Sequence, residues 1–328
     1  MKRTVFFALT CVLLSVVLIV FLTQRDKPQP LPEMRIEFEE ASPSGNYDEE
    51  KTIYVLENGV PVEMTLHDYL TGVLLGEMPA SFSAEALKAQ AVAARTFTLH
   101  ILQAGKHDGA ICESAACCQA YVAPESYLAA NGEMGSPVLE EMSQAVRATD
   151  GLVLEYGGTL IDAVFFSCSG GRTEAAIEVW GGDVPYLQAV DSPGEEDAVP
   201  FSDEKTISRE EFCAVLSGLD PACDFSAEPW IGTITYTQGG GVDEMELGGV
   251  FFDGTALRSV FSLRSTLFTV EVGESEVVFH TRGFGHRVGM SQYGADAMAR
   301  NGSTFEDILA YYYQGTELVC YEMKQVQP

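Results

Sequence analysis

The sequence predicts an α+β protein, with a helical catalytic core that carries β-hairpins, a β-rich second part, and one N-terminal transmembrane helix before both. Three observations support this class. Residues 52–64 hold two β-rich runs around an Asn-Gly turn, residues 66–104 hold two runs with helical character, and residues 230–281 alternate β-like runs with glycine turns. Strands therefore flank the helices without a regular βαβ alternation, which is typical of α+β folds.

The first 24 residues predict the membrane helix. After the basic start MKR, residues 5–23 are uncharged, close to the ~20 residues that cross a ~30 Å hydrocarbon layer. A secretory signal has a shorter apolar core and an A-x-A-like cleavage site, so we expect an uncleaved anchor. Lys2 and Arg3 favour a cytoplasmic N-terminus, which places the remaining chain outside the cytoplasm.

Composition divides the rest of the chain. Residues 25–51 are Pro-rich and then acidic, and predict a spacer; residues 52–322 predict the folded extracytoplasmic domain, and residues 323–328 a short tail. The net charge of −29 argues against nucleic acid or an anionic membrane surface as the main partner. The sequence leaves the oligomeric state open, with a dimer among the options.

Turn and cap residues indicate the element boundaries. Asn58-Gly59 predicts a hairpin turn, and Thr65 before Asp68 predicts the N-cap of a helix. An alanine-rich helix is expected from about residue 84 to 104, ending at Gly105. We also expect a hairpin at Gly157-Gly158, an acidic loop at 191–207, a helix in SQYGADAMAR, and caps at Ser208 with Glu211 and at Ser303 with Glu306.

Glu77 is the first candidate for catalysis. In YLTGVLLGEMP it continues the apolar stripe of Leu66, Leu70, Val73 and Leu74, at the C-terminal end of the expected helix. Burial and the partial negative charge of a helix end both raise the pKa of a carboxyl group. A protonated acid near neutral pH suits glycosidic cleavage. The alternative is that Glu77 only begins the turn at Met78-Pro79 and reaches solvent.

Lys88 and Arg95 are the second candidate pair. They are seven residues apart, so they fall within ~20° on one helix face, beside small residues. Two aligned bases in so acidic a chain suit a polar cleft. Equally, each base can pair with a surface acid.

The stretch HDGAICESAACC predicts a metal site. His107, Cys112, Cys117 and Cys118 together offer one imidazole and three thiolates, a ligand set that suits a closed, structural zinc site. The spacing is not that of a standard zinc finger, and a Cys112–Cys117 disulfide is the alternative. A zinc peptidase is less favoured, because the chain has no HExxH and the proposed shell has no open position.

The glycine-rich stretch RGFGHRVGMSQYG is the last candidate. It departs from the dinucleotide-binding spacing, because the glycine after Gly285 comes one residue late. A glycine-rich backbone can approach a ligand closely and present His286, Ser291 and Gln292. A purely structural turn is an equal alternative.

Four stretches together resemble the stage II sporulation protein D family, the membrane-anchored lytic transglycosylases of endospore-forming bacteria. They are DYLTGVLLGEMPASFSAEALKAQAVAARTF, HDGAICESAACCQAY, FFSCSGGRTE and GFGHRVGMSQYGADAMARNG. The resemblance implies that Glu77 is the essential acid of an E-M-P-x-x-[FW] motif. It further implies sugar contacts at Lys88, Arg95, Ser167, Ser169, His286, Ser291 and Gln292.

The resemblance also implies a reaction and partners. The expected reaction is cleavage of the bond between N-acetylmuramic acid and N-acetylglucosamine in peptide-stripped glycan strands, giving 1,6-anhydro ends during septal wall remodelling and forespore engulfment. The expected partners are an amidase, stage II sporulation protein P, and the membrane protein M. A muramidase-type hydrolase and a non-catalytic wall-binding activator of the amidase are the alternatives.

Two residues depart from the family pattern. Arg287 stands where the loop usually has the middle glycine of G-H-G-V-G, so its backbone conformation is an open question. Cys117 stands where zinc-binding relatives have a histidine, which leaves one histidine and three cysteines as ligands. That set still suits zinc, in a structural role that the chemistry does not need.

Overall fold

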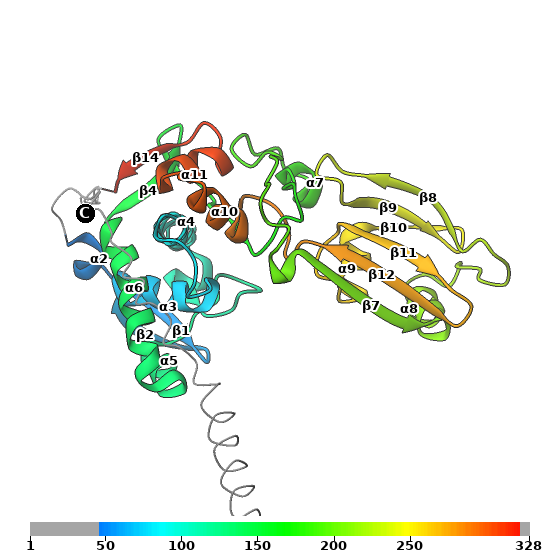
Figure 1. The fold of residues 1–328 in the computed structure, drawn as a ribbon, viewed down its shortest axis with the longest axis horizontal. Helices are drawn as coiled ribbons and strands as arrows, with labels where there is room; N and C mark the ends of the chain where they lie inside the picture. The colour runs from blue at the N-terminus through cyan, green and yellow to red at the C-terminus, as the bar shows by residue number, and fades with distance from the viewer. Residues whose placement is uncertain (1–45, 322–328) are drawn as a thin grey trace, which may run out of the picture. The chain divides into compact units, whose positions relative to one another are not determined.

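The computed structural model of the chain describes residues 46–321, and these residues form the predicted α+β fold (Figure 1). Within this range no helix combines the length and the apolar character that a membrane crossing requires. The expected anchor, most of the spacer and the whole of the expected tail lie outside the described residues.

The long helix α4 (Ala84–Gln103) lies at the centre of the helical part (Figure 1). Five of its six alanines are fully buried and allow close packing, and strand β4 and four helices contact it. Those helices are α3 (Leu66–Glu77), α6 (Gly135–Ala148), α10 (Gln292–Arg300) and α11 (Phe305–Tyr312), while α2 (Tyr47–Glu50) and α5 (Pro124–Asn131) lie against α3.

Three small sheets accompany these helices. In the first, β2 (Val60–Thr65) pairs with β1 (Thr52–Glu57), which pairs with β3 (Ile111–Cys112). In the second, β4 (Leu152–Tyr156) lies between β14 (Glu317–Cys320) and β5 (Thr159–Leu160). In the third, β13 (Met290–Ser291) runs parallel to β6 (Phe165–Phe166), and this pairing places the start of α10.

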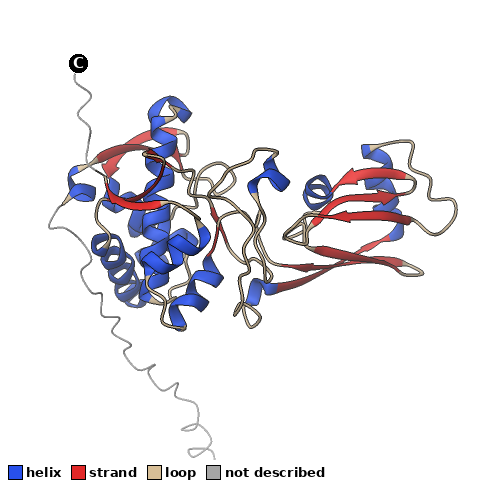
Figure 2. Cartoon of the chain, turned by 90° about the horizontal axis from the view of Figure 1, so that it is seen from above, coloured by secondary structure: helices blue, strands red, loops and turns tan. Residues whose placement is uncertain are grey.

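The β-rich part has a hydrophobic core of its own, built around Phe212, and Figure 2 shows its strands gathered apart from most helices. One sheet has the order β10-β9-β8 and the other β11-β12-β7. The strands are β7 (Ser202–Ser208), β8 (Ile231–Tyr236), β9 (Val242–Leu247), β10 (Val250–Asp253), β11 (Phe268–Val272) and β12 (Glu276–Arg282), with α8 (Arg209–Leu219) and α9 (Gly254–Val260). The short α7 (Ala176–Trp180) precedes this part in the chain.

Most predicted turns and caps are confirmed. Asn58 and Gly59 both have positive φ, as a two-residue hairpin turn requires, and β1 pairs antiparallel with β2. The hairpin at Gly157-Gly158 joins β4 to β5. The Thr65 hydroxyl accepts from the Asp68 N–H at 3.0 Å, and the Ser208 hydroxyl accepts from the Glu211 N–H at 3.1 Å.

Other predictions are wrong in detail. The cap of α11 is Thr304 with Asp307, one residue later than expected, because their side chains form the reciprocal hydrogen bonds. Strand β7 begins within the acidic segment expected to be a loop, since β12 supplies its partner. Helices α5, α6, α7 and α9 are not predicted by the sequence, and α2 lies within the expected spacer.

Candidate functional site

Glu77 is the last residue of α3, where the sequence placed it. The four apolar residues of its stripe are fully buried, and Glu77 itself is half-buried. The helix ends there because Met78 takes an extended conformation before Pro79. The carboxyl group therefore lies at the edge of the helical core, at the negative end of a helix.

Two donors contact the Glu77 carboxyl group. Its Oε1 accepts from the backbone N–H of Ala120 at 2.7 Å, and its Oε2 accepts from the Gln292 amide at 3.1 Å. Burial raises the pKa of Glu77, and the two hydrogen bonds lower it in part. The net pKa is above the ordinary value, so the predicted direction is confirmed. Glu77 is thus a half-buried acid with two protein donors, and not the solvent-exposed turn residue of the alternative.

The segment that carries Ala120 can lie close to Glu77 because α3 has glycine at two positions that face this segment. A Cβ on Gly76 would lie 3.0–3.1 Å from backbone atoms of Ala120 and Tyr121. A Cβ on Gly72 would lie 2.3 Å from the Tyr121 ring, and the Gly72 carbonyl accepts from Val122 N–H at 3.0 Å. The YLTGVLLGEMP sequence thus provides both the acid and the close approach of its backbone donor.

Gln292 is the first residue of α10, and the structure brings it to Glu77 from 215 positions away. Of the predicted sugar contacts, Gln292 is therefore the one that touches the candidate acid. The amide N–H favours the ionised form of Glu77 and so lowers its pKa.

Lys88, on α4, is buried at 3% exposure. Its ammonium group donates to Glu85 at 2.9 Å and lies 5.7 Å from the centre of the Phe305 ring. The other Glu85 oxygen accepts from the Phe305 N–H at 2.7 Å. Lys88 therefore pairs with an acid of its own helix, as the alternative interpretation of the sequence allows.

Arg95 has a structural role in place of the expected sugar contact. Its side chain is fully buried and forms an ion pair with Asp48, which is also buried. The guanidinium further donates to the carbonyls of Val146 and Leu152. These contacts join α2 to α4, α6 and β4, so Arg95 lies inside the core and not along a cleft.

Two of the three candidate serines, Ser169 and Ser291, meet at an acid that the sequence did not single out, Glu195. Ser169 and Ser291 are fully buried, and both hydroxyls donate to Glu195, at 3.0 and 2.7 Å. Ser167 is half-buried, and its carbonyl accepts from Tyr293 N–H at 3.0 Å. The side chains of Ser169 and Ser291 therefore support the loops instead of facing a ligand. Glu195 lies in an acidic loop and has no sequence signal that separates it from its neighbours.

His286 packs against Phe166 and Trp180. The centre of its ring lies 5.6 Å from the centre of the Phe166 ring and 5.3 Å from that of Trp180. Its Nδ1 accepts from the Val288 N–H at 3.2 Å. Burial, together with the nearby Arg258, lowers the pKa of His286 to about 4. The ring is therefore neutral at neutral pH, and half-exposed Trp180 lies against it.

Arg287 takes the glycine-like conformation, with φ of 65°. Its guanidinium donates to Glu174 at 3.0 Å, and both side chains are fully buried. Further donations go to the carbonyls of Ser169, Arg172 and Gly239, at 2.7–2.8 Å. These bonds offset the cost of a left-handed residue with a side chain.

The predicted metal ligands converge. The ligand atoms of His107, Cys112, Cys117 and Cys118 all lie within 4.8 Å of one another, and His107 Nε2 is 3.4 and 3.5 Å from the sulfurs of Cys117 and Cys118. A tetrahedral zinc site with Zn–S bonds of 2.3 Å has ligand separations of about 3.8 Å. The donor set and its spacing therefore fit the ion, and these cysteines are free thiols, so the alternative disulfide is not formed.

The backbone of this metal loop is unusual. After α4 ends, Gly105, His107 and Asp108 all have positive φ. Only glycine adopts this conformation without strain, so His107 is turned back towards the cysteines at a conformational cost. Lys106 donates to the Cys117 carbonyl at 2.7 Å. Two residues after Cys118 comes Ala120, the backbone donor of Glu77, so the metal loop and the acid share one segment.

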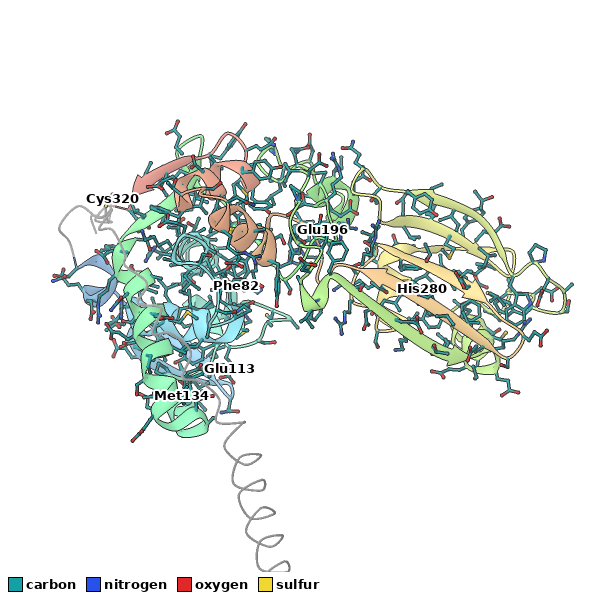
Figure 3. All side chains as sticks on the ribbon, in the orientation of Figure 1. Phe82, Glu113, Met134, Glu196, His280 and Cys320 are labelled. Carbon is teal, nitrogen blue, oxygen red and sulfur yellow. The ribbon has the colours of Figure 1, made fainter. Side chains whose placement is uncertain are left out.

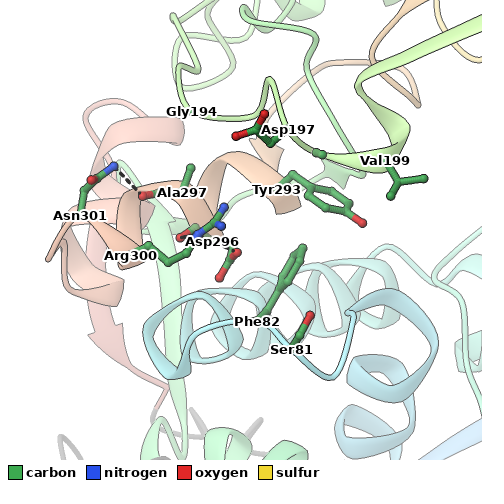
Figure 4. A pocket seen from close by; sticks show the side chains of 11 residues that line it. Ser81, Phe82, Gly194, Asp197, Val199, Tyr293, Asp296, Ala297, Arg300 and Asn301 are labelled. Atoms are coloured by element: carbon green, nitrogen blue, oxygen red, sulfur yellow. Dashed lines mark hydrogen bonds and ion pairs between the residues drawn. The ribbon is translucent and has the colours of Figure 1, made fainter. Parts of the chain in front are cut away.

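A cavity of about 590 Å³ is lined by Ser81 and Phe82, by residues of the 194–199 loop and by residues of α10, among them Tyr293, which follows Gln292 in the chain (Figure 4). Glu77 and Gln292 themselves do not line it. Phe82, also labelled in Figure 3, and Tyr293 point towards one another there, with ring centres 4.9 Å apart. On the α10 side, Asp296 is paired with Arg300 and accepts from Ser83. Aromatic rings beside hydrogen-bonding groups are suited to a polar, ring-shaped ligand.

Comparison with known proteins finds sequence relatives of this chain. The model of the stage II sporulation protein family, SpoIID, matches residues 57–156, which include Glu77 and the metal loop. Stage II sporulation protein D of Bacillus subtilis (strain 168) is 35% identical over 271 residues, 81% of this chain and 78% of that protein. The corresponding protein of Bacillus amyloliquefaciens is 34% identical, over 81% of this chain and 77% of that protein.

A further relative has a different name. The amidase enhancer of Bacillus subtilis (strain 168) is 29% identical over 77% of this chain and 40% of its own length. The match to stage II sporulation protein D is closer and covers most of both chains. This chain belongs to the stage II sporulation protein D family.

Proposed function

We propose that this chain is a lytic transglycosylase that cleaves the bond between N-acetylmuramic acid and N-acetylglucosamine in peptide-stripped peptidoglycan. One observation supports this most directly. Glu77 is a half-buried acid with a raised pKa, and it accepts hydrogen bonds from the Gln292 amide and the Ala120 N–H. Such an acid is protonated at higher pH than usual, while its carboxylate is already provided with donors.

The reaction needs one carboxyl group. Glu77 protonates the glycosidic oxygen, and the bond from that oxygen to C1 of the muramoyl unit breaks. The Glu77 carboxylate then takes the proton of the muramoyl C6 hydroxyl, whose oxygen bonds to C1. The product is a 1,6-anhydro end, no water is consumed, and Glu77 regains its proton. Among the described residues, neither donor to the Glu77 carboxyl group is an acid, whereas most hydrolases flank the bond with two carboxyl groups ~5–9.5 Å apart.

The metal loop has a structural role in this proposal. His107, Cys112, Cys117 and Cys118 would together bind zinc with no position left for a catalytic water. A bound ion would fix the segment that leads to Ala120. It would thereby hold the Ala120 N–H, which donates to Glu77, in place.

Family membership supports a proposed cellular setting. We propose that residues 1–24 anchor the chain in the mother-cell membrane and that residues 52–322 act outside the cytoplasm, in septal wall remodelling and engulfment. The proposed partners are the amidase stage II sporulation protein P, which would strip the stem peptides, and protein M. The name of the amidase enhancer relative is compatible with an amidase partner.

The decisive experiment compares the wild type with Glu77→Gln on peptide-free glycan strands, with mass analysis of the new ends. We expect 1,6-anhydro ends from the wild type and a loss of activity of at least roughly a hundredfold in the variant. Glu141→Gln is the matched control, because burial also raises the pKa of Glu141, on α6. Cleavage by Glu77→Gln at the wild-type rate would disprove the mechanism.

Two other functions are separated by the same digestion. Reducing ends, one water heavier than anhydro ends, identify a hydrolase of the muramidase type. The amidase enhancer relative supports a non-catalytic activator as the second candidate. In that case neither the wild type nor Glu77→Gln cleaves strands, and both stimulate the amidase equally.

Elemental analysis of the purified protein tests the metal. We expect close to one zinc per chain and its loss in Cys117→Ser. Cys213→Ser, which changes a cysteine of the β-rich part, is the control and should keep the metal. A content well below one zinc per chain in the wild type would remove the metal from the proposal.

A further inference from the structure

Glu195 is a buried acid at the centre of a hydrogen-bond network. Its side chain is 2% exposed, although its neighbour Glu196, labelled in Figure 3, is exposed. One oxygen, Oε1, accepts from the hydroxyls of Ser192 at 2.5 Å and Ser291 at 2.7 Å. The other, Oε2, accepts from the Ser169 N–H and hydroxyl, the Gly170 N–H and the Cys168 thiol, at 2.7–3.3 Å.

All these partners donate, and a carboxylate is the side chain that only accepts. The donors come from three segments: residues 168–170, the loop that carries Ser192 and Glu195, and the start of α10. We call this set the Glu195 network: Cys168, Ser169, Gly170, Ser192 and Ser291. A charged hydrogen bond at each contact makes the network stronger than neutral side chains would. The carboxylate therefore fixes three segments to one another.

The network ends next to the catalytic candidate. Ser291 is the N-cap of α10, where its hydroxyl accepts from the Gly294 N–H, and the next residue is Gln292, which donates to Glu77. The side chains around Gly294 leave the first turn of α10 little room to move. A Cβ there would lie 2.1 Å from the Tyr312 hydroxyl, 2.3 Å from Ser192 Oγ and 2.6 Å from Glu195 Oε1.

We propose that Glu195 is a positioning residue: through Ser291 it fixes the first turn of α10 so that the Gln292 amide is held against the Glu77 carboxyl group. The expected effect of Glu195 on kcat and on the pH profile rests on the proposed function. The expected effect on the contact between Gln292 and Glu77 does not depend on the reaction.

The inference predicts a specific change in Glu77. A hydrogen bond to the carboxylate favours the ionised form. When α10 is no longer fixed, Gln292 withdraws and the pKa of Glu77 rises. A general acid is active below its pKa, so the fall in kcat/KM on the alkaline side moves to higher pH. The titratable groups around the network are Cys168, Tyr312 and Arg287, and Tyr69 lies near Glu77.

The first experiment measures kcat/KM against pH on peptide-free glycan strands, with the full 328-residue chain. We expect Glu195→Gln to lower kcat more than it changes KM and to move the alkaline limb up by roughly one pH unit, the effect of one hydrogen bond to a charged group. Glu196→Gln makes the same substitution one residue along, at an exposed position, and should leave both quantities unchanged.

A double-mutant comparison separates positioning from general loss of stability. Gln292→Ala should move the limb as Glu195→Gln does, and the double variant should move it no further, because both act on one contact. A loss of activity in Glu195→Gln without a shift of the limb overturns the proposal. Shifts that add in the double variant overturn it as well.

If Glu195→Gln does not fold, Ser291→Ala replaces it, since this variant removes only the hydroxyl between Glu195 and α10. Thr304→Ala is its control, because Thr304 caps the neighbouring helix α11, which does not carry Gln292. We expect the shift in Ser291→Ala and not in Thr304→Ala. The same shift in both variants would show a general effect of cap loss and contradict the proposal.

A measurement without substrate keeps the two proposals apart. The Glu77 carboxyl carbon can be followed by NMR with ¹³C-labelled glutamate and assigned by its absence in Glu77→Gln. We expect its pKa to be higher in Ser291→Ala and Glu195→Gln than in the wild type. An unchanged pKa contradicts the role of Glu195, whereas cleavage by Glu77→Gln contradicts only the proposed function.

Discussion

At the scale of single residues, burial decides what each charged side chain does. Glu77 and Arg95 were both candidates for direct contact with substrate. Glu77 is half-buried and has two donors, while Arg95 is fully buried and paired with Asp48. A side chain without exposed surface cannot contact a glycan strand. Once paired with an opposite charge, it can take part in the core that holds the exposed residues in place.

Arg95→Ala tests this role. The variant leaves Asp48 buried without its cation, which destabilises a protein by about 3–5 kcal/mol. We therefore expect a lower midpoint in urea unfolding, while KM for glycan strands at a temperature where the variant is folded stays at the wild-type value. The double variant Asp48→Ala/Arg95→Ala should recover part of the stability. A raised KM with unchanged stability would instead support the sugar contact.

His286 makes stability depend on pH. Its pKa is about 4 in the folded protein, against an ordinary value of 6.5, because burial and Arg258 disfavour the charged ring. The unfolded chain therefore binds an extra proton between about pH 6.5 and pH 4, and this favours unfolding as the pH falls through that window. The stability that His286 contributes is present above pH 6.5 and lost below it.

The comparison of His286→Asn with the wild type isolates this contribution. Between pH 7.5 and pH 4.5 the wild type should lose about 2 kcal/mol more of its unfolding free energy than the variant, with allowance for the partial exposure of the ring. Urea unfolding at the two pH values measures it. An equal loss in both proteins would mean that His286 titrates normally in the folded state.

At the scale of elements, α3 and the segment after the metal loop form one unit. The helix has glycine at two positions that face the segment, so the backbone of Ala120 reaches the last residue of the helix. The sequence predicted the helix, its cap and its end from local signals. It did not predict which segment would cover the glycines, because that contact joins distant parts of the chain.

Gly76→Ala probes this contact. The added methyl group would lie about 3.0–3.1 Å from backbone atoms, which cannot rotate away as a side chain can. Alanine also favours the helix, by up to about 1 kcal/mol. We therefore expect a stability change of less than about 2 kcal/mol but a fall in kcat, because the Ala120 N–H moves away from Glu77. Gly59→Ala, at a hairpin turn with open space, is a control that should leave kcat unchanged. Wild-type kcat in Gly76→Ala would contradict the role of the Ala120 donor.

At the scale of the described molecule, Arg287 connects segments that lie far apart in the sequence. Its partners belong to residues 169–174 and to Gly239, which follows β8. Glu174 in turn accepts from Thr237, Gly239 and Gly241. The buried pair therefore fixes the turn between β8 and β9 against the loop that leads to α10.

Arg287→Gly restores the family pattern and should still destabilise this chain. Glycine removes left-handed strain of about 1–2 kcal/mol, but the loss of the cation leaves Glu174 buried alone, at a cost of about 3–5 kcal/mol. The expected net loss is about 1–4 kcal/mol in urea unfolding. Asn58→Gly, at another positive φ, is the control and should be nearly neutral or stabilising. A variant Arg287→Gly more stable than the wild type would contradict this account.

The sequence by itself determined the features that depend on neighbours along the chain. Helical periodicity placed Glu77 on the buried stripe, Asn-Gly and Gly-Gly pairs gave the hairpins, and short spacing gathered the metal ligands. Each of these depends on residues within a few turns, where backbone geometry fixes which side chains can meet.

Only the tertiary structure decided the contacts between distant segments. It paired Glu77 with Gln292 across 215 positions, enclosed Arg95 with Asp48, and placed Glu195 inside while Glu196 stays outside. Adjacent acids in one loop have the same local signal. Their roles differ because burial and hydrogen-bond partners are set by which distant elements pack together, and a carboxylate inside the fold requires donors that only this packing provides.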